Sequence, residues 1–282
     1  MIDFLTILSP FVVRWNVSPE LFHIGPIHVR YYGIMFIIGF ILGYYLFVRF
    51  FKRENLPLDL LDPLLYVLIG CTIVGARLGH VLFYEPAYYL ANPLKIFAIW
   101  QGGLASHGGA IAILIGIWWY SKHYGKKYKF DFLWLLDRLG IAVAFAGMFI
   151  RLGNLMNSEI YGDPTDLPWG FIFERNGEVV PKHPTQIYEA LSYFILGIIL
   201  LLLYYYAPKI KRGFLFGVFL IGLFGARFLI EFVKMPQVAF ENNMTLDMGQ
   251  LLSIPFVIVG IWLVIRSFYI KTPLLREEDR RK

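Results

Sequence analysis

Seven long apolar stretches dominate this sequence and limit what it can fold into. They cover residues 31–51, 62–83, 100–120, 133–150, 188–207, 213–233 and 249–270. The hydrocarbon core of a membrane is about 30 Å thick, which a helix of about 20 residues crosses at about 1.5 Å per residue. Because 58% of the residues are hydrophobic, the chain also carries more apolar surface than a soluble core needs. The sequence predicts an all-α integral membrane protein of about seven transmembrane helices, with residues 1–282 forming a single polytopic domain.

The distribution of lysine and arginine predicts the orientation of the chain. The connections at 49–53, 122–129 and 209–212 are basic, and so is the region from 266 to 282. Because loops rich in Lys and Arg stay on the cytoplasmic side, we expect the amino terminus outside and residues 271–282 to form a charged cytoplasmic tail. The net charge of +6 is spread over separate loops. This pattern favours contact with anionic membrane lipids and predicts no nucleic-acid partner.

Residues 1–13 are apolar but lack the basic start and the cleavage site of a signal peptide, so we interpret them as a short interfacial segment.

Three arginines lie in or at the end of apolar stretches. Arg77, Arg151 and Arg227 all fall towards the extracytoplasmic ends of their segments under this topology. A charge at such a depth is costly and usually marks a functional site. Two simpler readings stay open: Arg77 could extend to the lipid headgroups, and Arg227 could pair with Glu231 one helical turn later.

A histidine lies among glycines in the third stretch. Counted from Trp100, His107 is seven residues into the segment, about 10 Å below the outer surface at helical rise. A packing seam of small residues would explain the glycines, but a histidine in lipid needs a partner. Tyr32, at the start of the first stretch, lies on the same side of the membrane.

A long polar connection follows Arg151. Residues 151–187 form an extracytoplasmic loop between the fourth and fifth helices, well beyond ordinary connection lengths. Arg151 and Asn154 share one face if the helix continues past Arg151. We expect this loop to form a small head or lid over the site.

Several arginines in a pocket of low dielectric constant suit the phosphate of a lipid, because guanidinium binds phosphate through paired hydrogen bonds. A neighbouring histidine or tyrosine could deprotonate a nucleophile while the arginines stabilise a departing phosphate. The sequence thus predicts transfer of a lipid group away from its phosphate. No cofactor and no catalytic metal are predicted, since the chain has neither an HExxH motif nor an Asp-rich cluster. Cys71, the single cysteine, lies in an apolar setting and is interpreted as packing.

The chain resembles a known family over nearly its whole length. The resemblance is carried by Ile24-Gly25-Pro26, Arg30-Tyr31-Tyr32-Gly33, Gly75-Ala76-Arg77-Leu78-Gly79, Gly102-Gly103 to His107-Gly108-Gly109, Arg151-Leu152-Gly153-Asn154, Asn157-Ser158-Glu159 with Gly162, His183-Pro184-Thr185-Gln186, Tyr188-Glu189, Arg227-Phe228, Glu231-Phe232 and Met248-Gly249-Gln250. These motifs resemble those of the prolipoprotein diacylglyceryl transferases. One departure is Ser158, where many family members carry glycine.

The resemblance implies a seven-helix protein of the bacterial cytoplasmic (inner) membrane that acts on phosphatidylglycerol. The diacylglyceryl group would pass to the lipobox cysteine of prolipoprotein signal peptides, with release of glycerol phosphate. By resemblance, His107, Arg151 and Arg227 are catalytic. The phosphatidylglycerol-binding residues implied in the same way are Arg151, Arg227, Tyr32, Asn154, Glu159, Gly162, Arg77 and Glu231.

Two other classes of function were weighed against the transferase. An anionic lipid transporter or flippase would also need intramembrane arginines, but it requires a path through both leaflets, whereas these arginines cluster on one side. An intramembrane serine protease would need a serine facing a histidine, and Ser106 is adjacent to His107, so the two side chains point in different directions on a helix.

Overall fold

The computed structural model describes residues 12–25, 27–207, 209–236, 245–270 and 272–274. The interfacial segment predicted for 1–13 and the tail predicted for 271–282 therefore fall almost entirely outside the described residues. The chain divides into two compact units. Unit 1 comprises Met1–Leu46 and Asp137–Leu275, and unit 2 comprises Phe47–Leu136 and Arg276–Lys282.

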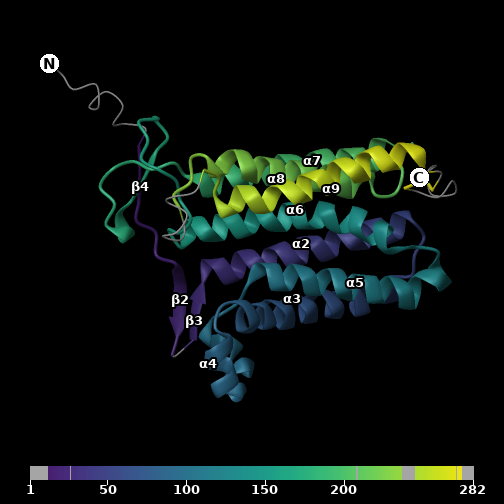
Figure 1. Ribbon diagram of the computed structural model, residues 1–282, viewed down its shortest axis with the longest axis horizontal. Helices are drawn as coiled ribbons and strands as arrows, with labels where there is room; N and C mark the ends of the chain where they lie inside the picture. Colours follow the sequence, from purple (N-terminus) through teal and green to yellow (C-terminus); the bar gives the residue numbers. More distant parts are fainter. Residues whose placement is uncertain (1–11, 26, 208, 237–244, 271, 275–282) are drawn as a thin grey trace. The chain divides into compact units, whose positions relative to one another are not determined.

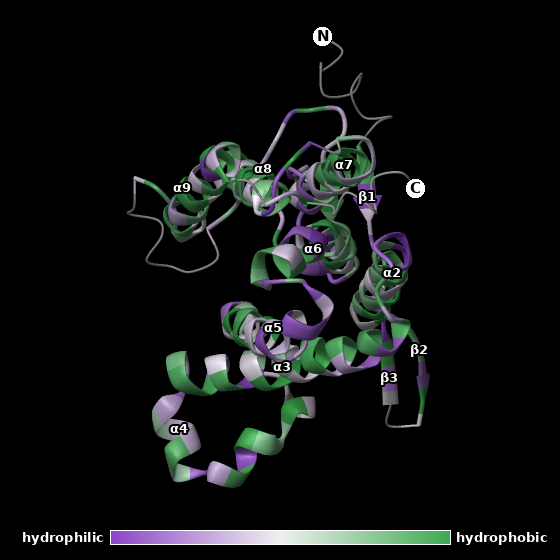
Figure 2. Ribbon diagram, turned by 90° about the vertical axis from the view of Figure 1, so that its right-hand side faces the viewer, coloured by the Kyte–Doolittle hydropathy of each residue, from purple (hydrophilic) through white to green (hydrophobic). Residues whose placement is uncertain are grey.

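Six helical segments among the described residues are long and apolar enough to cross a membrane (Figure 1). They are α2 (Tyr31–Arg53), α3 (Leu61–Phe83) with the short 3-10 helix η1 (Leu58–Leu60) before it, α6 (Phe132–Met156), α7 (Thr185–Tyr206), α8 (Phe214–Glu231) and α9 (Met248–Tyr269). Between 22% and 56% of each apolar window is buried within the protein. Apolar residues therefore also cover the outward faces of these helices (Figure 2), as contact with lipid requires. The prediction of a mostly helical chain is confirmed.

The third predicted stretch, 100–120, begins too early. Helix α5 spans Ser106–Tyr128, which makes it as long as α3 although less apolar. Gly102 and Gly103 have φ angles of 87° and 71°, in the left-handed region that a right-handed helix cannot use. His107 is consequently the second residue of α5, and its predicted depth inside a helix starting at Trp100 is wrong.

In unit 2, helices α3 and α5 meet along a seam of small residues. A Cβ atom at Gly75 or at Gly79 would overlap the backbone of Gly108. The amide of Ala105 donates a hydrogen bond to the carbonyl oxygen of Ala76 at 2.9 Å, which ties the start of α5 to the middle of α3. The interpretation of the glycines around His107 as a packing seam is confirmed for Gly108, which meets Gly75 and Gly79, but not for Gly102 and Gly103, which precede α5.

In the same unit, the connection between α3 and α5 contains the short helix α4 (Pro86–Ala91) and the 3-10 helices η2 (Pro93–Phe97) and η3 (Ile99–Gln101).

In unit 1, buried charges fix the beginning of α8. The two carboxylate oxygens of Asp137 accept hydrogen bonds from the amides of Gly213 and Phe216 at 2.7 and 2.9 Å. These amides belong to the first turn of α8, which otherwise has no hydrogen-bond partner for them. The neighbouring Arg138 donates to the carbonyl oxygen of Leu274 at 3.1 Å. Both side chains are fully buried, and they hold the end of α8 that lies away from Arg227.

Unit 1 also contains four short strands. Strand β1 (Val13–Trp15) pairs in parallel with β4 (Phe171–Phe173), and β2 (Glu20–Ile24) forms an antiparallel hairpin with β3 (Ile27–Arg30). Phe171 and Phe173 pack with Leu155, and the Trp15 indole donates to the carbonyl oxygen of Leu155 at 3.0 Å. The connection between α6 and α7 is therefore attached to the last turn of α6.

The non-helical connection between α6 and α7 is shorter than predicted. It covers residues 157–184 rather than 151–187, because α6 continues to Met156 and α7 begins at Thr185. It contains β4 and the 3-10 helix η4 (Glu174–Asn176). The extension of α6 places Arg151 and Asn154 on a continuous helix.

Candidate functional site

Arg151 is held in one orientation by two neighbours. Its Nε lies 2.5 Å from Oε2 of Glu189 on α7, and its Nη1 donates to Oδ1 of Asn154 at 3.1 Å. Asn154 is one turn further along α6, so the predicted shared face of Arg151 and Asn154 is confirmed. Because two sides of the guanidinium plane are fixed, the direction in which its other N–H groups point is also fixed.

Asn154 connects the arginine to the loop that follows α6. Its Nδ2 donates to Oε1 of Glu159 at 2.8 Å, and Nδ2 of Asn157 donates to the same oxygen at 3.0 Å. The loop turns sharply here, since Ser158 and Ile160 have φ angles of 54° and 61°. Such angles favour glycine, which gives a physical reason for glycine at position 158 in the family that the sequence resembles. The strained turn directs Glu159 back towards the end of α6.

The first turn of α7 holds this loop from the other side. Gln186 Nε2 donates to the carbonyl oxygen of Glu159 at 2.7 Å, and Thr185 Oγ1 donates to that of Ile160 at 2.8 Å. Gln186 and Thr185 are fully buried. The backbone of Glu159 and Ile160 is therefore held in place by side chains from a second helix.

The start of α2 also reaches this cluster. Tyr32 packs against Gly153 so closely that a Cβ atom at position 153 would lie 2.9 Å from the Tyr32 ring. The phenol of Tyr32 lies within electrostatic range of both Arg151 and Glu159. Tyr32, Arg151, Asn154 and Glu159, all predicted site residues, are thus brought together in unit 1.

Behind Arg151, buried charges continue across unit 1. Oε1 of Glu189 lies 3.5 Å from Nζ of Lys234, and the same Nζ lies 3.3 Å from Oε2 of Glu231. The sequence left open an ion pair between Glu231 and Arg227. The structure instead pairs Glu231 with Lys234, three residues later.

Arg227 lies one turn before Glu231 on α8 and is half-buried. Tyr193 on α7 is within electrostatic range of both Arg151 and Arg227, and its phenol is hydrogen-bonded to Arg151. Arg227 makes no hydrogen bond or ion pair with another residue of the described chain. The two arginines therefore both lie within electrostatic range of one phenol.

The residue before Gly162, Tyr161, is packed and hydrogen-bonded. The Tyr161 ring stacks on Phe173 with centroids 4.5 Å apart, and its hydroxyl donates to Oε1 of Glu178 at 2.9 Å. Burial raises the pKa of the Tyr161 phenol, so it remains a neutral hydrogen-bond donor at physiological pH. Tyr161 therefore anchors the chain next to Gly162.

In unit 2, the Arg77 side chain is hydrogen-bonded to the connection between α3 and α5. Its five hydrogen bonds go to the carbonyl oxygens of Lys95, Ile96, Ala98, Gly102 and Gly103, at distances of 2.6 to 3.4 Å. The guanidinium also lies over the ring of Tyr89, 4.9 Å from its centroid. The side chain does not extend to the surface, because the residue is 4% exposed. This geometry favours organisation of the connection over direct phosphate binding.

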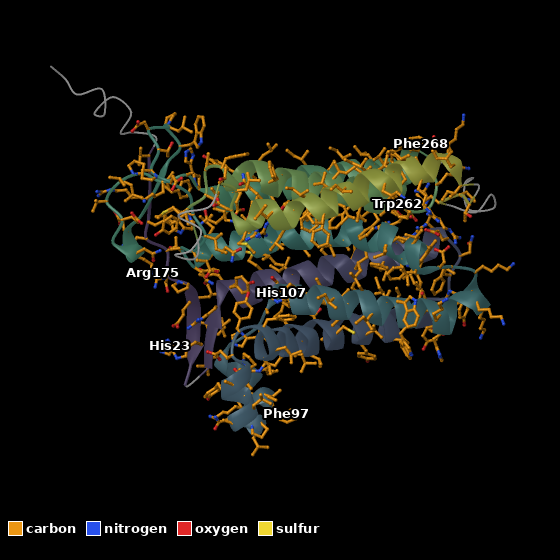
Figure 3. All side chains as sticks on the ribbon, viewed as in Figure 1. His23, Phe97, His107, Arg175, Trp262 and Phe268 are labelled. Carbon is orange, nitrogen blue, oxygen red and sulfur yellow. The ribbon has the colours of Figure 1, made fainter. Side chains whose placement is uncertain are left out.

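His107 is exposed at the start of α5 (Figure 3). Its ring packs edge-on against Phe83 with centroids 5.4 Å apart and lies 5.9 Å from the ring of Tyr84. His107 makes no hydrogen bond to another residue in the described part of the chain.

Comparison with known proteins shows which family the chain belongs to. A family model described as prolipoprotein diacylglyceryl transferase matches residues 19–266. The chain belongs to the prolipoprotein diacylglyceryl transferase family. The phosphatidylglycerol–prolipoprotein diacylglyceryl transferase of Tolumonas auensis is 51% identical over 254 residues, which cover 90% of this chain and 96% of that protein. Proteins of the same name from Porphyromonas gingivalis and Chloroherpeton thalassium are 47% and 44% identical, covering 95% and 90% of this chain and 98% and 94% of their own lengths.

In this member of the prolipoprotein diacylglyceryl transferase family, the sequence did not predict three residues of the candidate site. They are Glu189, Tyr193 and Lys234, all within the buried cluster of unit 1. Glu189 and Tyr193 lie four residues apart on α7, so a polar face inside an apolar span was the available signal. For Lys234 the available signal was its position three residues after Glu231, at the end of an apolar stretch.

Gly162, predicted to be functional in this family, joins the loop to the segment that follows α8. It forms an isolated antiparallel bridge with Lys234, and the amide of Asp163 donates to the carbonyl oxygen of Val233 at 2.9 Å. A Cβ atom at position 162 would overlap that carbonyl oxygen and approach His183 and Thr185. The absence of a side chain at Gly162 therefore allows the backbone that carries Lys234 to come close.

We expect Gly162→Ala to displace the Lys234 segment and to lower the rate of the reaction by about 10²-fold, since small misplacements of binding groups have effects of that size. Steady-state kinetics in phosphatidylglycerol vesicles measure the change. The matched control is Gly225→Ala on α8, where a Cβ atom would meet nothing within 4 Å. Equal activity in both variants would show that the close approach at Gly162 is unimportant.

Proposed function

We propose that this chain transfers the diacylglyceryl group of phosphatidylglycerol to the thiol of the lipobox cysteine in prolipoproteins. The product is a thioether, and glycerol phosphate is released, as the first step of bacterial lipoprotein maturation. Membership of the family supports this reaction. The observation that carries the proposal is the pair Arg151 and Arg227, both within electrostatic range of Tyr193: Glu189 and Asn154 orient the first, and the second makes no hydrogen bond or ion pair with the residues that the structure describes.

The two arginines bind the phosphate of phosphatidylglycerol in this proposal. Guanidinium remains charged and matches the geometry of phosphate oxygens. Four further residues shape the same site. The side chains of Tyr32, Asn154 and Glu159 line it, and Gly162 allows the backbone that carries Lys234 to come close. Glu231 contributes through Lys234, and Arg77 contributes by holding the connection that precedes His107. The polar hydrogen-bond network keeps these groups in place before the lipid binds.

The proposed reaction is a displacement at carbon. His107 accepts the proton of the substrate thiol, and the sulfur then forms a bond to the glyceryl carbon that carries the phosphate ester. The carbon–oxygen bond breaks, and its electron pair stays with the departing glycerol phosphate. Arg151 and Arg227 stabilise the negative charge that grows on this phosphate. The nucleophile belongs to the partner protein, so the chain's own Cys71 takes no part.

The topology that we propose for this reaction has seven spans, namely the six apolar helices named above and α5. The protein lies in the bacterial inner membrane as a single polytopic domain, with its amino terminus outside and the residues from 271 onwards on the cytoplasmic side. This orientation puts Arg151, Arg227 and His107 towards the extracytoplasmic leaflet, where secreted prolipoproteins arrive. Residues 157–184 form a small head that covers the site. The basic connections at 49–53, 122–129 and 209–212 support the orientation.

Mass spectrometry of a lipobox peptide tests the proposal. Purified protein in phosphatidylglycerol vesicles is incubated with the peptide, and a variant peptide with serine in place of the cysteine is the control. We expect a mass gain of one diacylglyceryl group on the cysteine peptide only. Movement of lipid between leaflets without any change in peptide mass would contradict the transferase and support a flippase.

A further inference from the structure

Four charges, three of them buried, alternate in sign in a chain of contacts that begins at the partly buried Arg151. Glu189 is shared between Arg151, 2.5 Å from Oε2, and Lys234, 3.5 Å from Oε1. Lys234 in turn contacts Glu231 at 3.3 Å. The side chains of Glu189 and Lys234 are each 1% exposed. Every charge thus has a neighbour of opposite sign, which buried ions require.

This arrangement has a consequence for anion binding. A carboxylate at 2.5 Å from the Arg151 guanidinium holds that side chain in place, but it also offsets the positive charge that would attract a phosphate. Charge interactions are strong in a buried site, so this loss of attraction is substantial. A second cation on the same carboxylate reduces this loss, because the negative charge of Glu189 is then shared between Lys234 and Arg151.

We infer that Lys234 is a positioning residue that tunes the lipid-phosphate site. Its ammonium group balances Glu189, so that the carboxylate can orient Arg151 without cancelling the attraction of Arg151 for the phosphate. Without the ammonium group, Arg151 would be accompanied by two carboxylates, those of Glu189 and Glu231, and the cluster would repel an anionic headgroup. The inference rests on the proposed function and adds the residue that sets the affinity of its site.

The backbone places Lys234 accurately enough for this role. Residue 234 forms a bridge with Gly162, and the adjacent hydrogen bonds run from Asp163 N to Val233 O at 2.9 Å and from Met235 N to Tyr161 O at 3.4 Å. The main chain at residue 234 is therefore held in place, and the two carboxylates hold the ammonium group at the other end of the side chain. Exposed lysines, by contrast, sample many positions at little cost.

Kinetics of four proteins test the inference: wild type, Lys234→Met, Lys234→Arg and the double variant Lys234→Met/Glu231→Gln. Both KM for phosphatidylglycerol and kcat are measured, together with the thermal unfolding temperature. We expect Lys234→Met to raise KM about tenfold with a smaller effect on kcat, because the charge of the binding site changes. Lys234→Arg keeps the charge and stays within about threefold of wild type.

The double variant removes one charge of each sign and therefore recovers a part of the lost affinity. It also keeps the test valid if Lys234→Met alone folds poorly, because no uncompensated buried charge remains. An unchanged KM in Lys234→Met, or a double variant whose KM is no better than that of Lys234→Met, would overturn the inference. Absence of diacylglyceryl transfer by the wild-type protein would overturn the proposed function instead, so the two failures are distinguishable.

Discussion

Replacing Arg151 with alanine should lower kcat/KM for diacylglyceryl transfer by about 10³-fold or more, the range found when a group that stabilises transition-state charge is removed. The variant loses the guanidinium that Glu189 and Asn154 hold in place. Helix α6 still carries its apolar side chains, so insertion into the membrane should be normal. The measurement is the rate of mass gain on a lipobox peptide in phosphatidylglycerol vesicles.

Two further variants separate loss of the arginine's function from loss of structure. Arg151→Ala leaves the buried carboxylate of Glu189 with Lys234 as its remaining ion-pair partner, which will lower stability. Arg151→Ala/Glu189→Gln removes the excess negative charge, and we expect it to recover stability while remaining inactive. Arg14→Ala is the matched surface control, since that side chain is 78% exposed. Full activity in Arg151→Ala would eliminate the proposed role.

Replacing His107 with alanine should lower the transfer rate by about 10²- to 10⁴-fold at neutral pH, the usual contribution of a general base. The imidazole is exposed and makes only ring contacts with Phe83 and Tyr84, so its removal should barely change stability. His123→Ala is the matched control, because His123 is also exposed on α5 but lies near its other end.

The pH dependence gives a sharper test of the base. A free cysteine thiol has a pKa of about 8.5, so at higher pH the substrate is already a thiolate and needs no base. The deficit of His107→Ala should therefore shrink as pH rises through that value, and added imidazole should restore part of the activity at pH 7. A deficit that is independent of pH and insensitive to imidazole would assign His107 to substrate positioning and the proton to another acceptor, such as the bound phosphate.

The sequence was sufficient to predict a mostly helical chain with six of its apolar helices and one local contact of the candidate site. Arg151 and Asn154 are three residues apart, and helical geometry alone predicted that they share a face, which their hydrogen bond confirms. The limit of this reasoning appears at His107. The left-handed backbone of Gly102 and Gly103 starts α5 at Ser106, and composition did not distinguish a glycine-rich helix from a glycine-rich turn.

Sequence spacing could not predict which residues of the candidate site meet from different helices. Glu189 contacts Arg151 from another helix. Lys234 contacts Glu189 from a segment whose backbone pairs with Gly162 in an isolated β-bridge. The sequence left open an ion pair of Glu231 with Arg227 at i,i+4, and the lysine at i,i+3 from Glu231 was not considered. The actual partner, Lys234, follows the end of α8, where the chain turns out of helical geometry.

The central claim is that Arg151 and Arg227 bind the phosphate of one lipid molecule. A double-mutant cycle of equilibrium binding to phosphatidylglycerol, measured in wild type, Arg151→Ala, Arg227→Ala and the double variant, tests it most directly. If both guanidinium groups contact one phosphate, the losses of binding free energy should be non-additive by about 1 kcal/mol or more. Additive losses within about 0.5 kcal/mol would mean that the two arginines act at separate places, and would contradict the account.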